Sequence, residues 1–398
     1  MKQILNIAHY EVLHIFKDPI LFLIVFIVPL VYAVLFGVVY CAGILNDIPI
    51  AIVDQDNTEL SREVAQAFAN SPQFKVVENI SSYSQLQQGM NRGTVRAGVV
   101  IPADFAQKVA EHRHAEVLTV YDSSNLVYGY NIRKYALEIT NQFNVNYTAR
   151  NLAGLGLSQQ EITNVMDAVS CNTSVWYNPT FSYVNFLYMG LMMMVIHQIG
   201  FLSISLTVTR EKERGCWINY LCAPISRVKI IAGKCLPYFI TNFFNYLLLI
   251  WFSSVFIHAK IEGSLFLIIL LGLIYDLIIT LAGFFISVQA PNSLQVTRYL
   301  MLLSVPFFLI SGYTWPSSHM PAILNGIARL LPFTWMAEGF RLTTIKGLGI
   351  MQILPNVLVL SIMAAVAIIL ALTFNKMRTM PDESGLTVNC GRSYPRRR

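Results

Sequence analysis

The sequence predicts a polytopic α-helical membrane protein with six transmembrane helices and one inserted α/β domain. Of its 398 residues, 55% are hydrophobic and 13% are charged, whereas a soluble domain carries about 25% charged residues. The mean hydropathy is +0.53. Six apolar runs each reach the ~20 residues that a ~30 Å hydrocarbon core demands. One long polar stretch, residues 44–181, separates the first apolar run from the other five.

The elements are expected in the following order. The N-terminal stretch is amphipathic, with Leu5, Val12 and Ile15 at helical spacing, and Asp18-Pro19 ends it; it predicts a helix lying in the membrane interface. The first apolar run is too long for a signal-peptide core and predicts a retained anchor. The predicted boundaries are 1–19 (interfacial helix), 20–43 (first span), 44–181 (α/β domain), 182–208 (second span), 209–228 (coupling loop or helix), 229–257 (third span), 264–288 (fourth span), 297–315 (fifth span), 316–347 (outer re-entrant helices), 353–374 (sixth span) and 375–398 (tail).

The polar stretch alternates short apolar runs with helical patterns, which indicates an α/β layer. Strands are predicted at Ile48–Val53, Phe74–Val77, Val95–Ile101 and Val117–Tyr121, and helices at Thr58–Ala69, Ser82–Asn91, Pro102–Glu111, Ser124–Leu155 and Ser158–Ala168. Asp54, Asp56 and Glu59 allow a cation site. Turn and cap roles are favoured, with Thr58 as the helix N-cap.

Charge and span number place the segments on two sides of the membrane. Residues 1–19, 209–235 and 375–398 together hold half of the 28 Lys and Arg residues, and short basic segments are typically cytoplasmic. Six spans put both termini on one side and the α/β domain on the other. Both arguments therefore predict cytoplasmic termini and an extracytoplasmic domain.

A short charged segment lies between the second and third apolar runs. Five consecutive charged residues, Arg210, Glu211, Lys212, Glu213 and Arg214, precede Gly215, and an apolar turn with Trp217 and Leu221 follows. A Lys or Arg at mid-membrane costs roughly 2.5–3.5 kcal/mol on insertion scales. The segment is therefore expected at a membrane surface. The residues alone leave a solvated, positive loop open as an alternative.

This segment resembles the cytoplasmic coupling loop of type-2 ABC exporter permeases, R-E-(K/R)-E-x-G-T-x-E-x-L, then P-(I/L)-S, then G-K-x-x-P. The match is carried by Arg210–Gly215, Pro224, Ile225, Ser226, Gly233, Lys234 and Pro237, whereas Cys216, Ile218 and Tyr220 depart from it. The resemblance implies a short helix that inserts into a separate ATPase subunit. It also implies a bacterial inner (plasma) membrane and a dimer of permeases.

A second segment, Val305 to Arg341, also resembles the family. The matching positions include Gly312, Pro316, Pro321, Pro332, Glu338 and Arg341. The resemblance implies two short helices that dip back into the outer leaflet as a gate, where protein-buried backbone tolerates proline. An ordinary outer loop with an interfacial aromatic belt of Tyr313, Trp315 and Trp335 is the alternative.

Motifs for catalysis or cofactor binding do not stand out. Gly233-Lys234 lacks the preceding glycine of a P-loop, and Cys235 replaces its Ser/Thr, so any ATP is expected on the partner subunit and no cofactor on this chain. The six cysteines form no C-x-x-C pair, which disfavours zinc; a Cys41–Cys171 disulfide stays open. Without an H-E-x-x-H or a Ser–His–Asp order, the chain is expected to be a transporter subunit and not an enzyme.

Two ionisable residues fall inside predicted spans. Asp276 lies in the middle of the fourth span, where an acid usually faces a partner or a watery path. A structural pair and a place on the transport route are both open. His197 in the second span is expected to be a helix–helix contact, as are Asn242 and Asn245 in the third.

The resemblance to type-2 ABC exporter permeases implies an ATP-driven exporter for a hydrophobic or amphiphilic compound, such as a drug, a lipid or a lipid-linked molecule. Expected partners are an ABC ATPase subunit, a second permease copy or paralogue, membrane lipid and a periplasmic adaptor, but not nucleic acid. Two alternatives remain. One is a membrane-anchored receptor or scaffold that senses a ligand through residues 45–180. The other is an ion-coupled transporter that uses Asp276.

Overall fold

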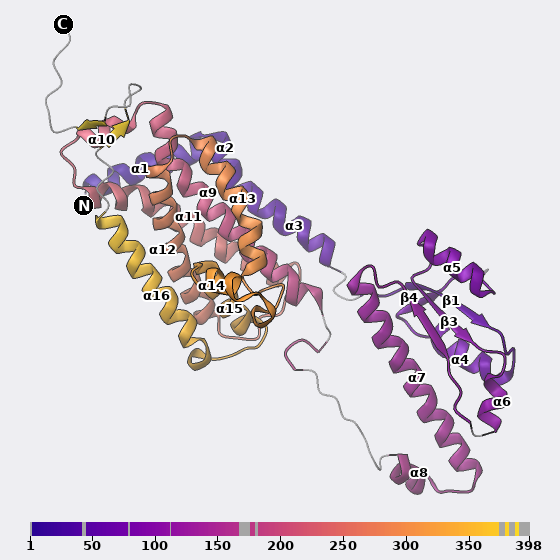
Figure 1. Cartoon of the computed structure of the whole chain (residues 1–398). Coiled ribbons are helices and arrows are strands. Elements are labelled where there is room, and N and C mark those ends of the chain that lie inside the picture. The colour runs from indigo at the N-terminus through magenta and orange to yellow at the C-terminus, as the bar shows by residue number, and fades with distance from the viewer. Residues whose placement is uncertain are drawn as a thin grey trace. The chain divides into compact units, whose positions relative to one another are not determined.

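The computed structural model of the chain describes residues 2–41, 45–78, 80–111, 113–166, 176–179, 182–373, 379–381 and 387–389. The chain divides into a helical unit, Met1–Gly43 with Trp176–Arg398, and an α/β unit, Ile44–Val175 (Figure 1). Each unit has hydrophobic clusters of its own. Cys171 lies outside the described residues, as does most of the basic tail, and Cys41 is a free, exposed cysteine in the structure.

Among the described residues, six helices are long and apolar enough to cross a membrane. They are Pro19–Tyr40, Val184–Glu213, Arg227–Val255, Leu265–Gln289, Ser293–Ile310 and Ile350–Leu372. Their labels in Figure 1 are α2–α3, α9, α11, α12, α13 and α16. The six helices confirm the prediction of a polytopic helical membrane protein.

Two of these helices differ in length from the sequence prediction for physical reasons. Helix α9 (Met189–Glu213) continues through the charged run instead of stopping near residue 208, because its charged side chains contact other parts of the protein. Helix α13 (Ser293–Ile310) begins earlier, where the Asn292 side chain accepts the Gln295 N–H. It ends earlier because Gly312 takes a left-handed conformation, with φ +81°.

The first span is irregular where a proline interrupts it. It consists of α2 (Pro19–Phe22), a π-helical turn (Leu23–Ile27) and α3 (Val28–Tyr40). Pro29 has no N–H to donate to the Val25 carbonyl. The Asn245 side chain of α11 (Arg227–Val255) donates to that carbonyl at 2.8 Å. Asn242 likewise reaches the Gly200 carbonyl of α9, so both expected cross-helix contacts are confirmed.

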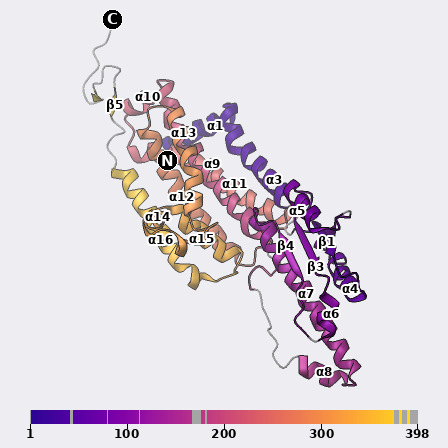
Figure 2. The same ribbon diagram turned by 45° about the vertical axis from the view of Figure 1, so that its right-hand side comes forward.

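Helix α1 (Lys2–Lys17) runs across one end of the helical unit, beside α11 (Figures 1 and 2). It buries Ile7, Ala8, Glu11 and Ile15. Gly233 of α11 makes this close approach possible, because a Cβ there would overlap the Ile7 side chain. We call this end of the unit, where α9 also finishes, the charged end.

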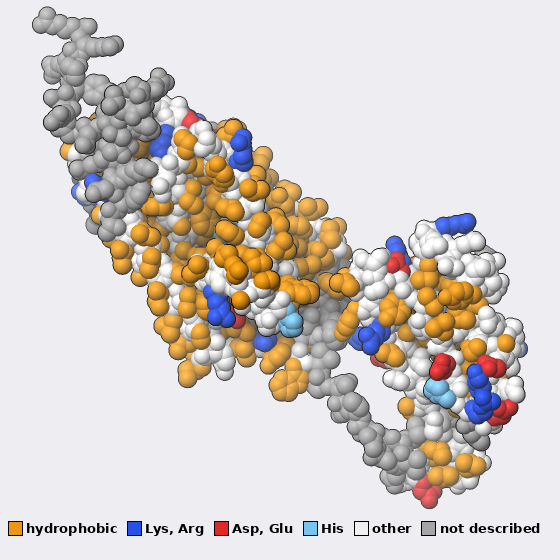
Figure 3. Space-filling view, viewed as in Figure 1, with side chains coloured by type: hydrophobic (Ala, Val, Ile, Leu, Met, Phe, Trp, Pro, Cys, Tyr) orange, Lys and Arg blue, Asp and Glu red, His pale blue; other side chains and the backbone are white. Residues whose placement is uncertain are grey.

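Apolar side chains also cover the outside of the helical unit. Figure 3 shows a broad hydrophobic surface over the helical unit on the face in view, with charged side chains near the two ends of that unit. Leu302 and Ile362, for example, are 68% and 62% exposed. Such a surface suits lipid and not water.

At the end opposite α1, three short helices join α13 to α16 (Ile350–Thr373). A 3₁₀ turn at Ser317–His319 is followed by α14 (Ala322–Arg329) and α15 (Pro332–Thr344). Pro321 is the N-cap of α14, and Pro332 opens α15, positions where no N–H is needed. A two-stranded pairing, β5 (Thr379–Pro381) with β6 (Thr387–Asn389), follows α16 in the sequence.

The α/β unit holds a four-stranded sheet in the order β2-β1-β3-β4. Strands β1 (Ile48–Asp54), β2 (Phe74–Val76) and β3 (Ala97–Ile101) are parallel, and β4 (Leu118–Tyr121) is antiparallel to β3. One face packs on α4 (Glu59–Ala69), α6 (Phe105–Ala110) and α7 (Leu126–Gly154), the other on α5 (Tyr83–Arg92). Helix α8 (Gln159–Met166) follows α7. Strands and helices lie where the alternating pattern predicts them.

The turn after β1 shows what its acidic residues do. Asp54 accepts from the backbone N–H groups of Asp56 and Asn57 and from the Ser61 hydroxyl. Asp56 accepts from the Thr58 hydroxyl and the Ala106 N–H. Thr58 caps α4 through a reciprocal capping box with Ser61. The predicted turn and cap roles are confirmed.

Candidate functional site

The candidate site is a group of charged residues at the charged end, where α9 finishes. We call it the charge cluster. Its members are Glu11, Asp18, Arg210, Glu211, Lys212, Glu213, Arg214 and Lys234. They come from α1, the N-cap residue just before the first span, α9 with its C-cap, and α11.

Arg210 joins the end of α9 to the start of the first span. Its Nη1 lies 2.6 Å from Asp18 Oδ2. Asp18 is also the N-cap of α2, where its side chain accepts the N–H groups of Ile20 and Leu21. Burial alone would raise the Asp18 pKa, but the Leu21 N–H and the Arg210 guanidinium outweigh it and lower this pKa. The resulting stability is present at neutral pH and is lost as the pH falls through the lowered pKa.

Lys212 and Glu213 bind the two helix ends that meet beside α9. Lys212 Nζ donates to the Ser287, Val288 and Ala290 carbonyls at 3.3, 2.5 and 2.9 Å. These carbonyls end α12 (Leu265–Gln289), where a cation suits the helix dipole. The Glu213 carboxylate accepts the Ser293 N–H and hydroxyl at 2.6 and 2.9 Å, at the start of α13.

Lys234 lies at the centre of a buried triad with two carboxylates. Its Nζ is 2.5 Å from Glu11 Oε1 and 2.7 Å from Glu211 Oε1. The Lys234 side chain is fully buried, and Glu11 also accepts the Thr207 hydroxyl at 3.0 Å. Removing one partner of such a buried group typically costs about 3–5 kcal/mol. The triad therefore fixes α1 to both α9 and α11.

A short helix, α10 (Trp217–Cys222), covers the triad. The Lys234 ammonium lies 4.6 Å from the Tyr220 ring centroid and 5.9 Å from that of Trp217. Trp217 is only 2% exposed, and burial raises the Tyr220 pKa. Gly215, with φ +69°, makes the turn from α9 into α10.

The predicted coupling residues therefore fall into two groups. Arg210, Glu211, Lys212 and Trp217 point into the helical unit, whereas Glu213, Arg214, Gly215 and Cys216 are exposed. The side chain of Leu221 lies outside the described residues. Sequence reasoning did not single out Glu11, Asp18, Ser287 or Ser293. Glu11 had a signal: it lies on the apolar side of an amphipathic helix, four residues from Ile7 and from Ile15.

The predicted gate residues meet at the opposite end. Arg341 of α15 donates to the Gly312 and Tyr313 carbonyls at 3.3 and 3.4 Å, and its guanidinium lies 5.6 Å from the Tyr313 ring centroid. Glu338 accepts from Asn356 of α16 at 3.3 Å. A cavity of about 290 Å³ is lined by Gly312, Glu338 and Arg341. Pro316, Pro321 and Pro332 instead lie at the starts of the 3₁₀ turn, α14 and α15.

The two ionisable residues within the spans have different surroundings. His197 Nδ1 is 2.5 Å from the Tyr275 hydroxyl, and its ring lies among Phe201, Phe307 and Phe333. Asp276 is 6% exposed, and its Oδ2 has no hydrogen-bond partner among the described residues. His197 is therefore a helix–helix contact, whereas Asp276 is a buried acid without a hydrogen bond at that oxygen.

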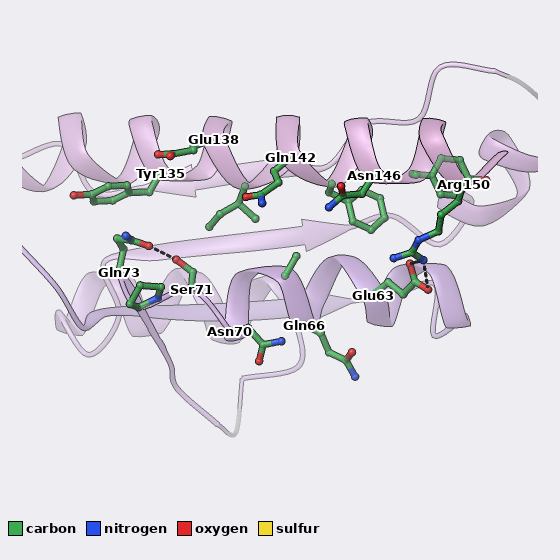
Figure 4. Close-up of a pocket in the computed structure, with 15 residues that line it drawn as sticks. Glu63, Gln66, Asn70, Ser71, Gln73, Tyr135, Glu138, Gln142, Asn146 and Arg150 are labelled. Carbon is green, nitrogen blue, oxygen red and sulfur yellow. Dashed lines mark hydrogen bonds and ion pairs between the residues drawn. The ribbon is translucent and has the colours of Figure 1, made fainter. Parts of the chain in front are cut away.

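The α/β unit has an open groove between α4 and α7, of about 630 Å³ (Figure 4). Arg150 bridges the groove to Glu63 at 3.0–3.1 Å. Glu138, Gln142, Asn146 and Arg150 line the α7 side at four-residue spacing. This polar stripe on one helix face is the sequence signal that could have found the groove.

Comparison with known proteins decides the family. The family described as "ABC-2 family transporter protein" matches residues 20–373. The chain belongs to the ABC-2 family. ABC-2 relatives include the probable multidrug ABC transporter permease YbhR of Escherichia coli, 28% identical over 71% of this chain and 74% of the relative. YbhS of Escherichia coli, with the same description, is 23% identical over 94% and 96%. The linearmycin resistance permease protein LnrN of Bacillus subtilis is 24% identical over 87% and 94%.

The ABC-2 assignment confirms the resemblance found in the coupling and gate segments. Together with the six apolar helices, it identifies a multi-pass inner-membrane permease subunit of an ABC exporter. ABC-2 membership also implies an ATPase subunit as partner. The family match starts at residue 20, so α1 with Glu11 precedes the matched region.

Proposed function

We propose that this chain moves a hydrophobic or amphiphilic compound, such as a drug, a lipid or a lipid-linked molecule, out of the cytoplasm or the inner leaflet. It works as a dimer with a second copy or a paralogue, and each copy engages one ATPase subunit. The names of YbhR, YbhS and LnrN as multidrug or resistance permeases support this substrate class. ATP binds to the partner and not to this chain.

The charge cluster is the observation that carries this proposal. Three consecutive residues of α9 contact three other parts of the unit: Glu211 binds α11, Lys212 the end of α12, and Glu213 the start of α13. Force applied by an ATPase at Arg214, Gly215 or Cys216 therefore reaches several spans together. Closure of the ATPases on ATP then biases the spans between two arrangements.

The proposed orientation follows from the span number. Six spans leave both termini and the charged end in the cytoplasm and the α/β unit outside, where it docks a periplasmic adaptor or gates the exit. Helices α14 and α15 then form the outer, re-entrant gate. Accessibility labelling tests this: Cys216 should react only from the cytoplasm, and a cysteine in place of Asp56 only from outside. Labelling of both from one side would contradict the orientation.

Changing Glu213 and Arg214 together to Ala should separate ATP hydrolysis from export. The double variant loses the contact with Ser293 and the exposed guanidinium that lies 3.5 Å from Asp18. We expect normal membrane insertion and continued ATP hydrolysis by the complex. Export should fall on the order of fivefold or more, because typical coupling free energies of about 1–3 kcal/mol correspond to factors of about 5 to 150. Vesicles that hold the chain with its ATPase measure both rates.

A matched control changes one base and one acid elsewhere. Lys260→Ala with Glu262→Ala removes the same charges from the loop before α12, away from the charged end. It should leave the export rate near that of the unmodified protein. Full export by the Glu213/Arg214 variant would count against coupling through this segment.

Asp276 Oδ2 has no hydrogen-bond partner in the described part of the chain, which keeps one alternative, a transporter driven by an ion gradient. Asp276→Asn keeps the shape and removes the titratable proton. Under the ATP-driven proposal, the variant should export at a normal rate and change only in thermal stability. Export that needs a proton gradient, continues without ATP and disappears in Asp276→Asn would instead establish the ion-coupled alternative.

A further inference from the structure

A second feature of the charged end shares Arg214 with the predicted coupling segment but lies mainly on α1 and the start of the first span. A cavity of about 440 Å³ opens at the junction of α1 and α2. Tyr10, His14 and Lys17 line it from α1, Ile20 from α2, and Arg214 from the end of α9. Neither the ABC-2 assignment nor the proposed coupling gives this cavity a role.

The cavity has an excess of positive charge. The Asp18 carboxylate already binds Arg210 at 2.6 Å and caps α2. Arg214 lies farther from Asp18, at 3.5 Å, and its side chain is 60% exposed. Lys17 forms no ion pair within the described part of the chain. Burial lowers the His14 pKa, so this ring adds little charge at neutral pH. Lys17 and Arg214 are thus two cations available to an anion.

The rim of the cavity is apolar on the side of the first span. Leu13, Pro19 and Ile20 are its apolar lining residues, and Ile20 is 62% exposed. Pro19 and Ile20 are the first residues of the first span. The two cations therefore lie where the interfacial helix meets the hydrocarbon region, beside side chains that suit acyl chains.

We propose that this cavity binds the phosphate headgroup of an anionic phospholipid. Lys17 and Arg214 donate to the phosphate oxygens, as charge-assisted donors do, and the acyl chains run from Ile20 along the first span. The lipid is a fixed ligand of the permease and not its cargo. An acidic patch of the ATPase would match the two cations but not the apolar rim, so we assign the cavity to lipid.

The test measures lipid preference of the purified, full-length protein. Native mass spectrometry would record how much dioctanoyl phosphatidylglycerol it binds relative to dioctanoyl phosphatidylcholine. The unmodified protein should prefer phosphatidylglycerol. Lys17→Gln and Arg214→Gln should each weaken that binding about fivefold, the equivalent of about 1 kcal/mol for each basic residue near an anionic surface.

Lys2→Gln is the matched control, because it removes the same charge from the opposite end of α1. It should leave lipid binding unchanged. A loss in Lys2→Gln as large as in Lys17→Gln would overturn the proposal, as would an unmodified protein without preference. Glycerol phosphate is added as a competitor at the same concentration as the lipid. If glycerol phosphate displaced the lipid, the cavity would be a site for free phosphate and not for a lipid headgroup. Lipid binding that survives in both cavity variants, with loss of ATPase co-purification, would assign the cavity to the ATPase.

Discussion

Replacement of Lys234 by Met should destabilise the protein more than any other single charge removal proposed here. The change leaves the Glu11 and Glu211 carboxylates close together and buried without their shared cation. The expected loss is about 3–5 kcal/mol of unfolding free energy. Helix α1 should detach from α11, and ATP-driven export should fall with it. The fraction that stays folded after a fixed heating time, in one detergent, measures the effect.

The control for this prediction lies on the same helix. Lys229 of α11 is partly exposed and contacts Gln3 at 2.8 Å, so Lys229→Met should change stability by less than about 0.5 kcal/mol. The double variant Glu11→Gln with Lys234→Met also removes the Glu11 charge, which Lys234→Met alone leaves without a cation. The double variant should therefore be more stable than Lys234→Met. Equal heat resistance of Lys234→Met and Lys229→Met would show that the triad contributes little.

Replacement of Gly190 by Ala should disturb the end of the unit that holds α14 and α15. A Cβ at Gly190 would overlap the ring of Tyr313. That ring cannot move freely, because it is 2% exposed, its hydroxyl donates to the Phe186 carbonyl at 2.8 Å, and Arg341 lies over it. We expect a loss of about 1–3 kcal/mol from overpacking and slower export through a displaced gate.

Gly326 of α14 gives the matched control, since nothing lies within 4 Å of a Cβ built there. Gly326→Ala should be neutral or stabilising by up to about 1 kcal/mol, because Ala favours a helix. Adding Tyr313→Leu to Gly190→Ala should recover some of the stability by making room for the methyl group. If Gly190→Ala and Gly326→Ala behaved alike in thermal unfolding and export, the packing argument would be wrong.

Much of the fold was predictable because local patterns decide it. Apolar runs of sufficient length predict the six spans, and the alternation of Ile48–Val53 with the helical pattern after Thr58 predicts the α/β unit. Capping is also local, which is why the role of Thr58 was correct. The π-helical turn in the first span was not predictable, because the Val25 carbonyl finds its donor in Asn245, 220 positions later.

The charge cluster shows why the candidate site was only partly predictable. The sequence marks Arg210–Arg214 as unusual but does not say what each charge contacts. Glu11 and Lys234 are 223 positions apart, and no local rule joins them. Burial of Trp217 was equally hidden, since a six-residue helix that covers its own protein and one that inserts into a partner have the same apolar spacing.

The Glu11–Lys234 contact has a consequence for how the chain matures during synthesis. The acid is made within the first dozen residues, but its cation belongs to the third span. Helix α1 therefore cannot take its final place until that span has entered the bilayer. If synthesis stopped before the third span was inserted, Glu11 would lack its ion-pair partner and α1 would stay undocked. Quality-control proteases could then recognise the undocked amphipathic segment as a sign of incomplete assembly.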